Sequence, residues 1–412
     1  MKRSGDGSII GRREFLKRGV LAGVGVSILP LAGAASASVQ PAAHVRRYST
    51  LGRTGFKISD ISFGASRLTA GNEDLVRHAF DCGVNYFDSA ETYTDGESET
   101  TIGNALKGRR DKVFLTSKTI ARADDRRGSM MTALEASLRR LQTDHIDVYF
   151  NHAVNDPARL KNPEWYEFVS QARSQGKIRF TGMSGHAGNL AQCLDYAIDS
   201  GHFDVILCAH NFGQDPRFYQ RFTHNFDFIA IQPELPRLME KAKRHGVGVV
   251  VMKTLMGARL NDMRPYEAGG ATFSQAAFRW VLSNSNVDAL IVSMTSRQLI
   301  DEYLGASGAR ATAAQDLPLL NRYASLNGDS QCRPACNECA NACPFGVPIA
   351  DVMRTRMYAR DYGDIRLARS EYAMLSENAA ACLSCDAKPC AGACPHGIAT
   401  EVLLAPTHRM LA

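Results

Sequence analysis

The chain has 412 residues, of which 45% are hydrophobic and 22% charged, a composition typical of globular rather than disordered proteins. At this length we expect one large domain and a smaller one. Residues 1–37 hold six basic and two acidic residues and so contribute +4 of the net charge of +6. The remainder lacks the concentrated basic surplus that nucleic-acid binding requires, so no nucleic-acid partner is expected.

The amino terminus has the pattern of an export signal. Arg12 and Arg13 precede an apolar run at 20–31, and Ala35-Ser36-Ala37 matches an A-x-A cleavage site. Twelve residues rise only about 18 Å as a helix, which is too short to cross the hydrocarbon core. We interpret residues 1–37 as a twin-arginine signal peptide, which predicts transport of the folded protein to the periplasm by the twin-arginine export machinery. The alternatives are an ordinary basic signal or an uncleaved anchor.

After the signal, short apolar runs alternate with amphipathic helical segments. The runs with strand-like composition are 58–64, 85–90, 112–118, 146–152, 180–185, 205–211, 247–254 and 289–294. Between them the periodicity predicts helices over 74–82, 130–141, 165–175, 190–199, 235–245, 273–282 and 298–304. Glycine stands where a left-handed C-terminal residue is expected at Gly83, Gly176, Gly201 and Gly246.

This alternation predicts an α/β fold of the (β/α)8 TIM-barrel type. A doubly wound open sheet would show a glycine-rich fingerprint after its first strand, and the segment 61–66 contains only Gly64. In a TIM barrel, chemistry collects at the carboxyl ends of the strands. Four polar residues lie at or just after consecutive strand ends: Asp88, Tyr93, Lys118 and His152. Each alone has an ordinary structural interpretation, but together they are the candidate catalytic set.

The chain resembles the aldo-keto reductase family over roughly residues 45–310. The resemblance is carried by the segments 48–66, 83–93 and 176–186, by LTSK ending at Lys118 and by YFNH ending at His152. It implies a barrel enzyme that reduces the carbonyl of a small-molecule substrate, or oxidises an alcohol, with a nicotinamide cofactor. The catalytic Asp, Tyr, Lys and His of the family then correspond to Asp88, Tyr93, Lys118 and His152.

The chemistry of these four side chains agrees with that correspondence. A carbonyl that accepts hydride develops negative charge on oxygen and needs a proton donor, but a phenol with a pKa of about 10 is a weak acid. A neighbouring ammonium lowers the pKa of a phenol. We therefore expect Tyr93 to be the acid, Lys118 to lower its pKa and Asp88 to hold Lys118. His152 is expected to orient the carbonyl oxygen.

The resemblance also implies a cofactor site, where this sequence departs from the family pattern. Leu207 stands where a glutamine is expected, and Lys253 stands where many members have an aromatic residue. Arg297 is the residue that favours NADP(H), because it could bind the 2′-phosphate. The candidate cofactor-binding residues are Ser184, Asn211, Lys253, Arg297 and Glu302.

Eight of the eleven cysteines lie in two runs near the carboxyl end. The runs are Cys332-x3-Cys336-x2-Cys339-x3-Cys343-Pro344 and Cys382-x2-Cys385-x4-Cys390-x3-Cys394-Pro395. Both end in C-x3-C-P, as in bacterial two-cluster proteins, where the fourth cysteine ligates the other cluster. We predict two [4Fe–4S] clusters, one held by the first three cysteines of the first run with Cys394, the other by the first three of the second run with Cys343. Two zinc sites or four disulfides are the alternatives.

These patterns predict three parts: a signal peptide at 1–37, a barrel at 45–312 and a ferredoxin-like 4Fe–4S domain at 325–405. Such an appendage occurs in a variant of the aldo-keto reductase family. We expect an oxidoreductase that uses NADP(H), electrons relayed by the clusters from a redox partner protein, or both. The alternative is an iron–sulfur electron-transfer or assembly protein built on a catalytically degenerate barrel.

Overall fold

The structure is a computed structural model that describes residues 43–186, 188–214, 234–255, 263–267, 272–327, 332, 336–360 and 364–412. The predicted signal peptide lies outside the described residues. All described residues belong to one compact unit, which begins at Ala42. Within them, no helix has the length and apolar character that a membrane span requires.

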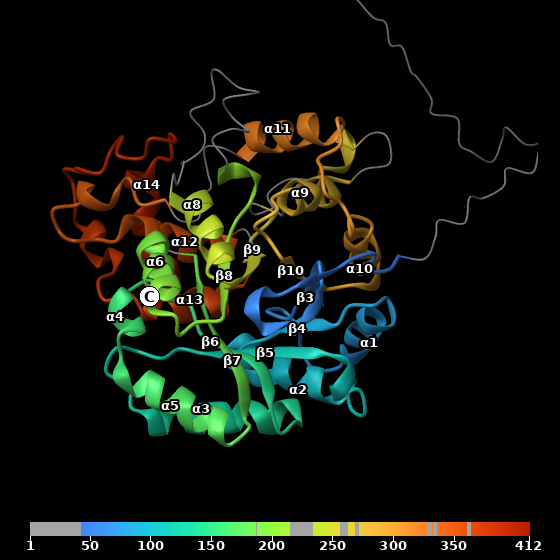
Figure 1. Cartoon of the computed structure of the whole chain (residues 1–412). Helices are drawn as coiled ribbons and strands as arrows, with labels where there is room; N and C mark the ends of the chain where they lie inside the picture. Colours follow the sequence, from blue (N-terminus) through green and yellow to red (C-terminus); the bar gives the residue numbers. More distant parts are fainter. Residues whose placement is uncertain are drawn as a thin grey trace, which may run out of the picture. The chain divides into compact units, whose positions relative to one another are not determined.

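Eight parallel strands form a closed barrel in the order β10-β3-β4-β5-β6-β7-β8-β9 (Figure 1). Their bounds are β3 Ile61–Gly64, β4 Tyr86–Asp88, β5 Phe114–Thr119, β6 Ile146–Asn151, β7 Ile178–Gly185, β8 Val205–Ala209, β9 Gly248–Met252 and β10 Ala289–Ser293. Every strand overlaps one of the predicted runs. The prediction of a parallel eight-stranded barrel is therefore confirmed.

Side chains that alternate along the strands form two layers, because successive residues of a strand point to opposite faces. Tyr86, Val148 and Phe150 belong to the cluster inside the barrel, whereas Phe87 and Tyr149 pack toward the helices. Because parallel strands are buried on both faces, their sequences are continuous apolar runs, and this is the pattern that predicts them.

An antiparallel hairpin, β1 (Tyr48–Thr50) and β2 (Lys57–Ser59), precedes the barrel. Leu51 and Ile58 of this hairpin region belong to the cluster inside the barrel. Phe56 stacks on Phe114, the first residue of β5, with ring centroids 4.3 Å apart. The hairpin therefore covers the amino-terminal end of the barrel, and the opposite end carries the site.

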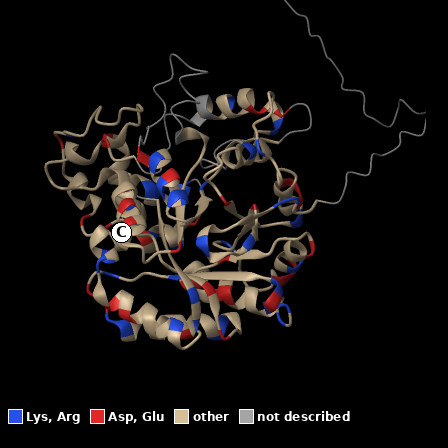
Figure 2. Ribbon diagram, in the orientation of Figure 1, with Lys and Arg blue, Asp and Glu red and all other residues tan. Residues whose placement is uncertain are grey.

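Helices surround the strands, and Lys, Arg, Asp and Glu are interspersed over them (Figure 2). The helices of the barrel region are α1 Glu73–Asp81, α2 Glu97–Ala105, α3 Arg127–Leu141, α4 Pro157–Leu160, α5 Pro163–Ser174, α6 Leu190–Ser200, α8 Glu234–Arg244, α9 Phe273–Leu282 and α10 Arg297–Leu304. The periodicity did not predict α2, because its buried face includes Ser98, Glu99 and Thr101. The four glycines expected to be left-handed all have positive φ, between 68° and 93°.

Helix α11 (Asp316–Asn327) packs on α9, and Arg279 pairs with Asp316 at 2.5 Å. Beyond it, we define residues 332–412 as the C-terminal module. The module contains α12 (Ile349–Arg360), α13 (Ile365–Ala373) and α14 (Thr400–Leu411), with its own apolar cluster that includes several cysteines. Its described residues form helices and turns and no strand. The ferredoxin-like character of the module remains a prediction from cysteine spacing.

The C-terminal module is bonded to the loops at the carboxyl end of the barrel. Asp351 of α12 accepts hydrogen bonds from Asn155 Nδ2 at 2.8 Å and from the Gly188 backbone N–H at 3.2 Å. Arg366 of α13 pairs with Asp95, which follows β4. The module therefore contacts the face of the barrel where the predicted catalytic residues lie.

Candidate active site

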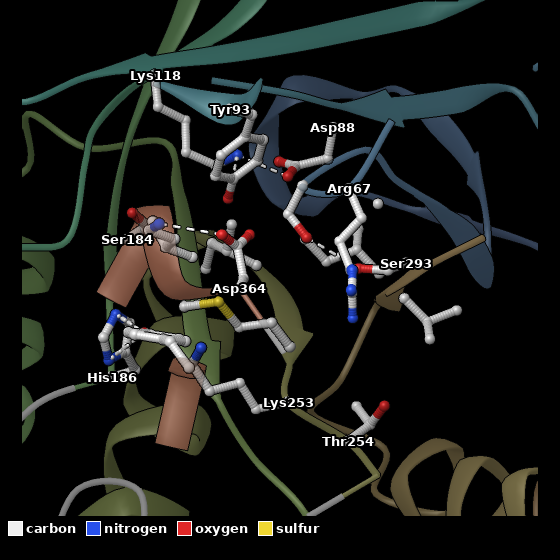
Figure 3. A pocket seen from close by; sticks show the side chains of 18 of the residues that line it. Arg67, Asp88, Tyr93, Lys118, Ser184, His186, Lys253, Thr254, Ser293 and Asp364 are labelled. Carbon is white, nitrogen blue, oxygen red and sulfur yellow. Dashed lines mark hydrogen bonds and ion pairs between the residues drawn. The ribbon is translucent and has the colours of Figure 1, made fainter. Parts of the chain in front are cut away.

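The four predicted catalytic residues lie together at the carboxyl ends of three adjacent strands. Asp88 ends β4, Lys118 lies near the end of β5, and His152 directly follows β6. Tyr93 begins a short turn after β4. All four line one cavity of about 180 Å³ (Figure 3). The structure thus brings the whole predicted set into one site.

Lys118 and Asp88 form a buried ion pair. Lys118 Nζ lies 2.6 Å from Asp88 Oδ1, and the two side chains are 0% and 1% exposed. Thr116 donates to the other carboxylate oxygen at 2.9 Å, and the ammonium also donates to the Ser89 carbonyl at 2.5 Å. Burial raises the pKa of Asp88 and lowers that of Lys118, while the ion pair opposes both changes. Asp88 therefore holds the ammonium of Lys118 in position.

Tyr93 lies next to this pair. Its hydroxyl oxygen is 3.5 Å from Lys118 Nζ, which also lies 4.7 Å from the centre of the phenol ring. The residue pattern alone predicts that the ammonium of Lys118 lowers the pKa of Tyr93. The structure corrects this: burial raises the pKa of Tyr93 well above its ordinary value, and the negative charges of Asp88 and Glu371 add to the rise. The phenol therefore stays protonated at neutral pH and is available as a proton donor.

His152 completes the set with a neutral ring. Its pKa is lowered well below the ordinary value by burial and then by the positive charges of Lys118, Arg159 and Lys253. The ring lies at 79° to the Tyr93 ring, with centroids 5.6 Å apart. Nδ1 has no hydrogen-bond partner among the described residues. A neutral imidazole in this place can donate one hydrogen bond to a carbonyl oxygen.

Two of the five candidate cofactor-binding residues, Ser184 and Lys253, line the same cavity. Ser184 Oγ accepts a hydrogen bond from the Ala153 N–H at 3.0 Å. Asn211 lies behind the cavity wall, where its side chain donates to the Lys253 carbonyl at 3.3 Å. Lys253 has a φ of 59°, which is uncommon outside glycine. Asn211 therefore contacts the Lys253 turn rather than the cavity.

The other two candidates lie on α10 and are not part of the cavity lining. Arg297 is 57% exposed and pairs with Asp74 of α1 at 3.3 Å. Glu302 accepts a hydrogen bond from Thr272 Oγ1 at 2.7 Å. Tyr303 of the same helix does line the cavity. In this structure Arg297 and Glu302 therefore bind other parts of the chain.

Sequence reasoning missed one wall of the cavity, which the C-terminal module supplies. Its residues are Tyr358 of α12 and Asp364, Leu367 and Glu371 of the α13 region. The Tyr358 hydroxyl lies 2.6 Å from His186 Nε2, and Lys253 Nζ lies 4.3 Å from the centre of the Tyr358 ring. The segment 351–376, which lies between the two cysteine runs, is rich in Arg and Tyr and its composition indicates only a helical spacer. No local pattern could show that it folds back over the barrel.

Glu371 and Lys253 are ionisable groups of this composite cavity with strongly shifted pKa values. Burial raises the pKa of Glu371 to about 7, although the positive charges of Lys253 and Arg159 oppose the rise. Burial lowers the pKa of Lys253 to about 8, opposed by Glu371. Both groups therefore change charge close to neutral pH.

The variant Glu371→Gln should reveal this half-buried carboxyl in the pH dependence of stability. A folded-state pKa raised to about 7 means that the protonated carboxyl stabilises the fold fully below its ordinary pKa, and that this contribution is lost as the pH rises through 7. The amide cannot ionise, so the variant should gain stability relative to the wild type between about pH 5.5 and about pH 8.5. Urea unfolding at both pH values measures this change. The exposed Glu377→Gln is the matched control, and parallel pH profiles for Glu371→Gln and wild type would contradict the prediction.

The pKa shifts of the C-terminal cysteines couple their thiols in two groups, and the interleaved pairing stays a prediction from the cysteine spacing. Burial and the charges of Cys332, Cys336 and Cys394 raise the pKa of the Cys339 thiol to about 12. Burial and the charges of the cysteines of the other set raise the pKa of Cys382 to about 11; those cysteines are Cys343, Cys390 and Cys385. None of the eleven cysteines, all of which are described, forms a disulfide. The pKa of each of these two thiols is thus raised by the cysteines that the interleaved pairing assigns to the same set.

The fold and the site define a class: a TIM-barrel enzyme with a protonated tyrosine, a buried lysine–aspartate pair and a neutral histidine at the barrel mouth. The aldo/keto reductase family matches residues 60–268, just over half of the chain. The chain belongs to this family and is an oxidoreductase.

Individual relatives are distant. The uncharacterized oxidoreductase YqkF of Bacillus subtilis is 23% identical over 302 residues, which cover 67% of this chain and 96% of that protein. The holo form of the aldo-keto reductase AKR11C1 from Bacillus halodurans is 21% identical with a TM-score of 0.52, covering 68% of this chain and 96% of that one. An aldo/keto reductase from Klebsiella pneumoniae, in complex with NADP and acetate, is 25% identical with a TM-score of 0.52, covering 68% and 95%.

Proposed function

We propose that this protein reduces the carbonyl group of a small-molecule substrate, or catalyses the reverse oxidation, with NADP(H). The observation that carries the proposal is the convergence of Tyr93, Lys118, Asp88 and His152 on one cavity. The Klebsiella pneumoniae relative in complex with NADP supports the choice of cofactor. An electron-transfer protein on a degenerate barrel would have no chemical need for this arrangement.

The cavity offers polar groups that suit a nicotinamide. Ser184 Oγ accepts a hydrogen bond from a backbone N–H and donates none to a described residue, so its proton is available to an amide carbonyl. His152 Nδ1 is likewise unpartnered among the described residues. Ser184 would hold the carboxamide, and Lys253 would line the same end of the cavity. NADPH, when bound, would supply the hydride.

The protein's own residues would act on the carbonyl oxygen. His152 and Tyr93 would donate hydrogen bonds to it, which orients the substrate and stabilises the negative charge that develops there. Tyr93 would transfer its proton to that oxygen, because an alkoxide is a stronger base than a phenolate. Lys118, held by Asp88 at 2.6 Å, would stabilise the phenolate left behind.

A direct experiment is a titration of anaerobically purified protein with NADPH in the presence of a panel of aldehydes and ketones. We expect NADPH to be consumed in proportion to the alcohol formed. If the fluorescence measurement detects no binding of NADPH to the protein, the assignment of NADP(H) as cofactor is refuted. Binding without turnover across the panel would instead favour an electron-transfer role.

We propose that the two cysteine sets each bind a [4Fe–4S] cluster. The two C-x3-C-P endings and the grouping of four thiols in each set support this. Arg354 of α12 is 2% exposed and donates to the Cys336 carbonyl, so a buried positive charge lies beside the first set. Such a charge would offset the negative charge of thiolate-bound iron. Zinc is the alternative metal for these cysteines. Measuring the iron and zinc content of the protein distinguishes zinc sites from iron–sulfur clusters.

Cys394→Ala is expected to remove the cluster of the first set and to spare the second. The iron content should fall from about eight to about four atoms per chain, because each cluster holds four. The variant should lose the same electron paramagnetic resonance signal as Cys332→Ala, whereas Cys343→Ala should lose the signal that Cys382→Ala loses. Cys193→Ala, in the barrel, is the control with unchanged iron. If Cys394→Ala and Cys382→Ala lost the same signal, the interleaved pairing would be wrong.

We propose further that the protein is exported by the twin-arginine machinery and acts in the periplasm, where a redox partner protein could deliver electrons through the clusters. The Arg12-Arg13 pair supports export, since this route carries proteins folded around their cofactors. Carbonyl reduction consumes two electrons, and two clusters could supply one each. Arg12→Lys/Arg13→Lys should retain the protein in the cytoplasm. Turnover with a one-electron donor that survived loss of the clusters would refute the relay.

A further inference from the structure

The first and last helices of the barrel carry metal-ligating side chains at their contact. Helix α1 packs beside α10 (Figure 1). His78 lies on α1, and Cys82 follows four residues later as the C-cap residue of that helix. Residues four apart lie on one face of a helix, so both side chains can reach the same neighbour. Asp301 of α10 is that neighbour, 223 positions away in the sequence.

The three ligand atoms are spaced as a metal site requires. His78 Nε2 lies 2.8 Å from Asp301 Oδ1 and 3.8 Å from Cys82 Sγ, and all three atoms lie within 4.8 Å of one another. Zinc binds His nitrogen and carboxylate oxygen at about 2.1 Å and Cys sulfur at about 2.3 Å. A tetrahedron with those bond lengths has edges of about 3.4 Å between nitrogen and oxygen and about 3.6 Å between nitrogen and sulfur. Ligation would therefore need shifts of about 0.6 Å in the N–O distance and about 0.2 Å in the N–S distance.

The charges around the cluster also favour a cation. Two other acidic residues of α1 have arginine partners: Asp81 pairs with Arg109 and Asp74 with Arg297. Asp301 has no lysine or arginine partner in the part of the chain that the structure describes, and its ion-pair partner there is His78. The Asp301 carboxylate and the Cys82 thiol both contact the His78 imidazole, so the cluster offers one oxygen, one sulfur and one nitrogen ligand. This donor set suits Zn²⁺ better than Mg²⁺ or Ca²⁺.

We propose that His78, Cys82 and Asp301 form a zinc site that links α1 to α10, with the fourth position open to water. This site is separate from the catalytic cavity and from the C-terminal cysteines, and it does not depend on the proposed function. The ion would join the helix after the first barrel strand to the helix after the last one. Since α10 also carries Tyr303 of the cavity wall, the ion would hold that helix in place.

The test compares zinc binding by the full-length protein with binding by Cys82→Ser and His78→Gln. All three proteins have the same C-terminal cysteines, so the difference in stoichiometry isolates this site. Competition with a chromophoric chelator should show one fewer zinc equivalent for each variant. Added Zn²⁺ should raise the Tm of the wild type by a few degrees more than that of either variant, roughly as expected for one further site with the ligand well above its Kd.

Asp81→Asn is the matched control, because it removes a neighbouring acidic residue of α1 that is not a ligand. It should bind zinc as the wild type does. Co²⁺ provides a second readout: a thiolate-to-cobalt absorption band should be weaker in Cys82→Ser than in Asp81→Asn. Equal zinc stoichiometry and equal Tm shifts in all four proteins would overturn the proposal and leave an ordinary His–Asp hydrogen bond.

Discussion

The variant Tyr93→Phe is expected to lower kcat for carbonyl reduction by about 10²- to 10⁴-fold, the usual contribution of a positioned general acid. The burial that raises the pKa of Tyr93 keeps its proton on the phenol at neutral pH, and phenylalanine has no proton to give. KM should change little, because His152 would still bind the carbonyl oxygen. Steady-state kinetics at saturating NADPH measures both constants.

Stability serves as the control for this variant. The hydrogen bond that Lys118 Nζ donates to the Tyr93 hydroxyl oxygen is long, at 3.5 Å, so its loss should hardly change the Tm. Tyr303→Phe removes a hydroxyl group from another cavity tyrosine and should retain activity within a few-fold. Equal losses of activity in Tyr93→Phe and Tyr303→Phe would remove Tyr93 from the role of acid.

The variant Lys118→Met is expected to destabilise the protein by about 3–5 kcal/mol and to abolish activity. Methionine fits the space but leaves the Asp88 carboxylate buried without its positive partner, which is the costly way to break a buried ion pair. Chemical unfolding with urea measures the loss. Lys177→Met, which breaks the more exposed pair with Glu135, should cost only about 0–1 kcal/mol.

The same variant has a predicted pH dependence. Burial raises the pKa of Asp88 even with Lys118 present, and without the ammonium the rise should be larger. A raised folded-state pKa stabilises the fold while the group is protonated and loses that contribution as the pH rises through it. Lys118→Met should therefore be closer to wild-type stability at about pH 5 than at about pH 8. The double variant Lys118→Met/Asp88→Asn should regain stability but not activity, which separates the two roles of the pair.

Local pattern was sufficient to predict the barrel and to select the candidate catalytic residues. The eight strands are continuous apolar runs bounded by glycine and polar residues, and burial on both faces produces that pattern in any parallel barrel. The closure of the barrel then determines that the ends of consecutive strands meet at one face. Asp88, Lys118 and His152 could be assigned to one site for this reason, without knowledge of any long-range contact.

Other features could not be predicted, because they depend on contacts between distant segments. Hydrophobic periodicity does not predict helix α2, because the helix buries polar side chains such as Glu99. The ion-pair partner of Glu99 is Arg140, which lies on α3. The wall that Tyr358 and Glu371 add to the cavity requires the chain to fold back across the barrel mouth. The sequence alone allows Arg297 to bind the 2′-phosphate of the cofactor. In the structure, however, its side chain forms an ion pair with Asp74.

The sequence by itself determined the type of barrel, the candidate catalytic residues at its strand ends and the two cysteine runs, because each follows from residue types at short spacing. Only the tertiary structure decided the direction of the Tyr93 pKa shift, the composite cavity and the contact of His78 with Asp301. The pKa shift depends on how completely water is excluded, and exclusion is a property of packed surfaces rather than of neighbours in the chain.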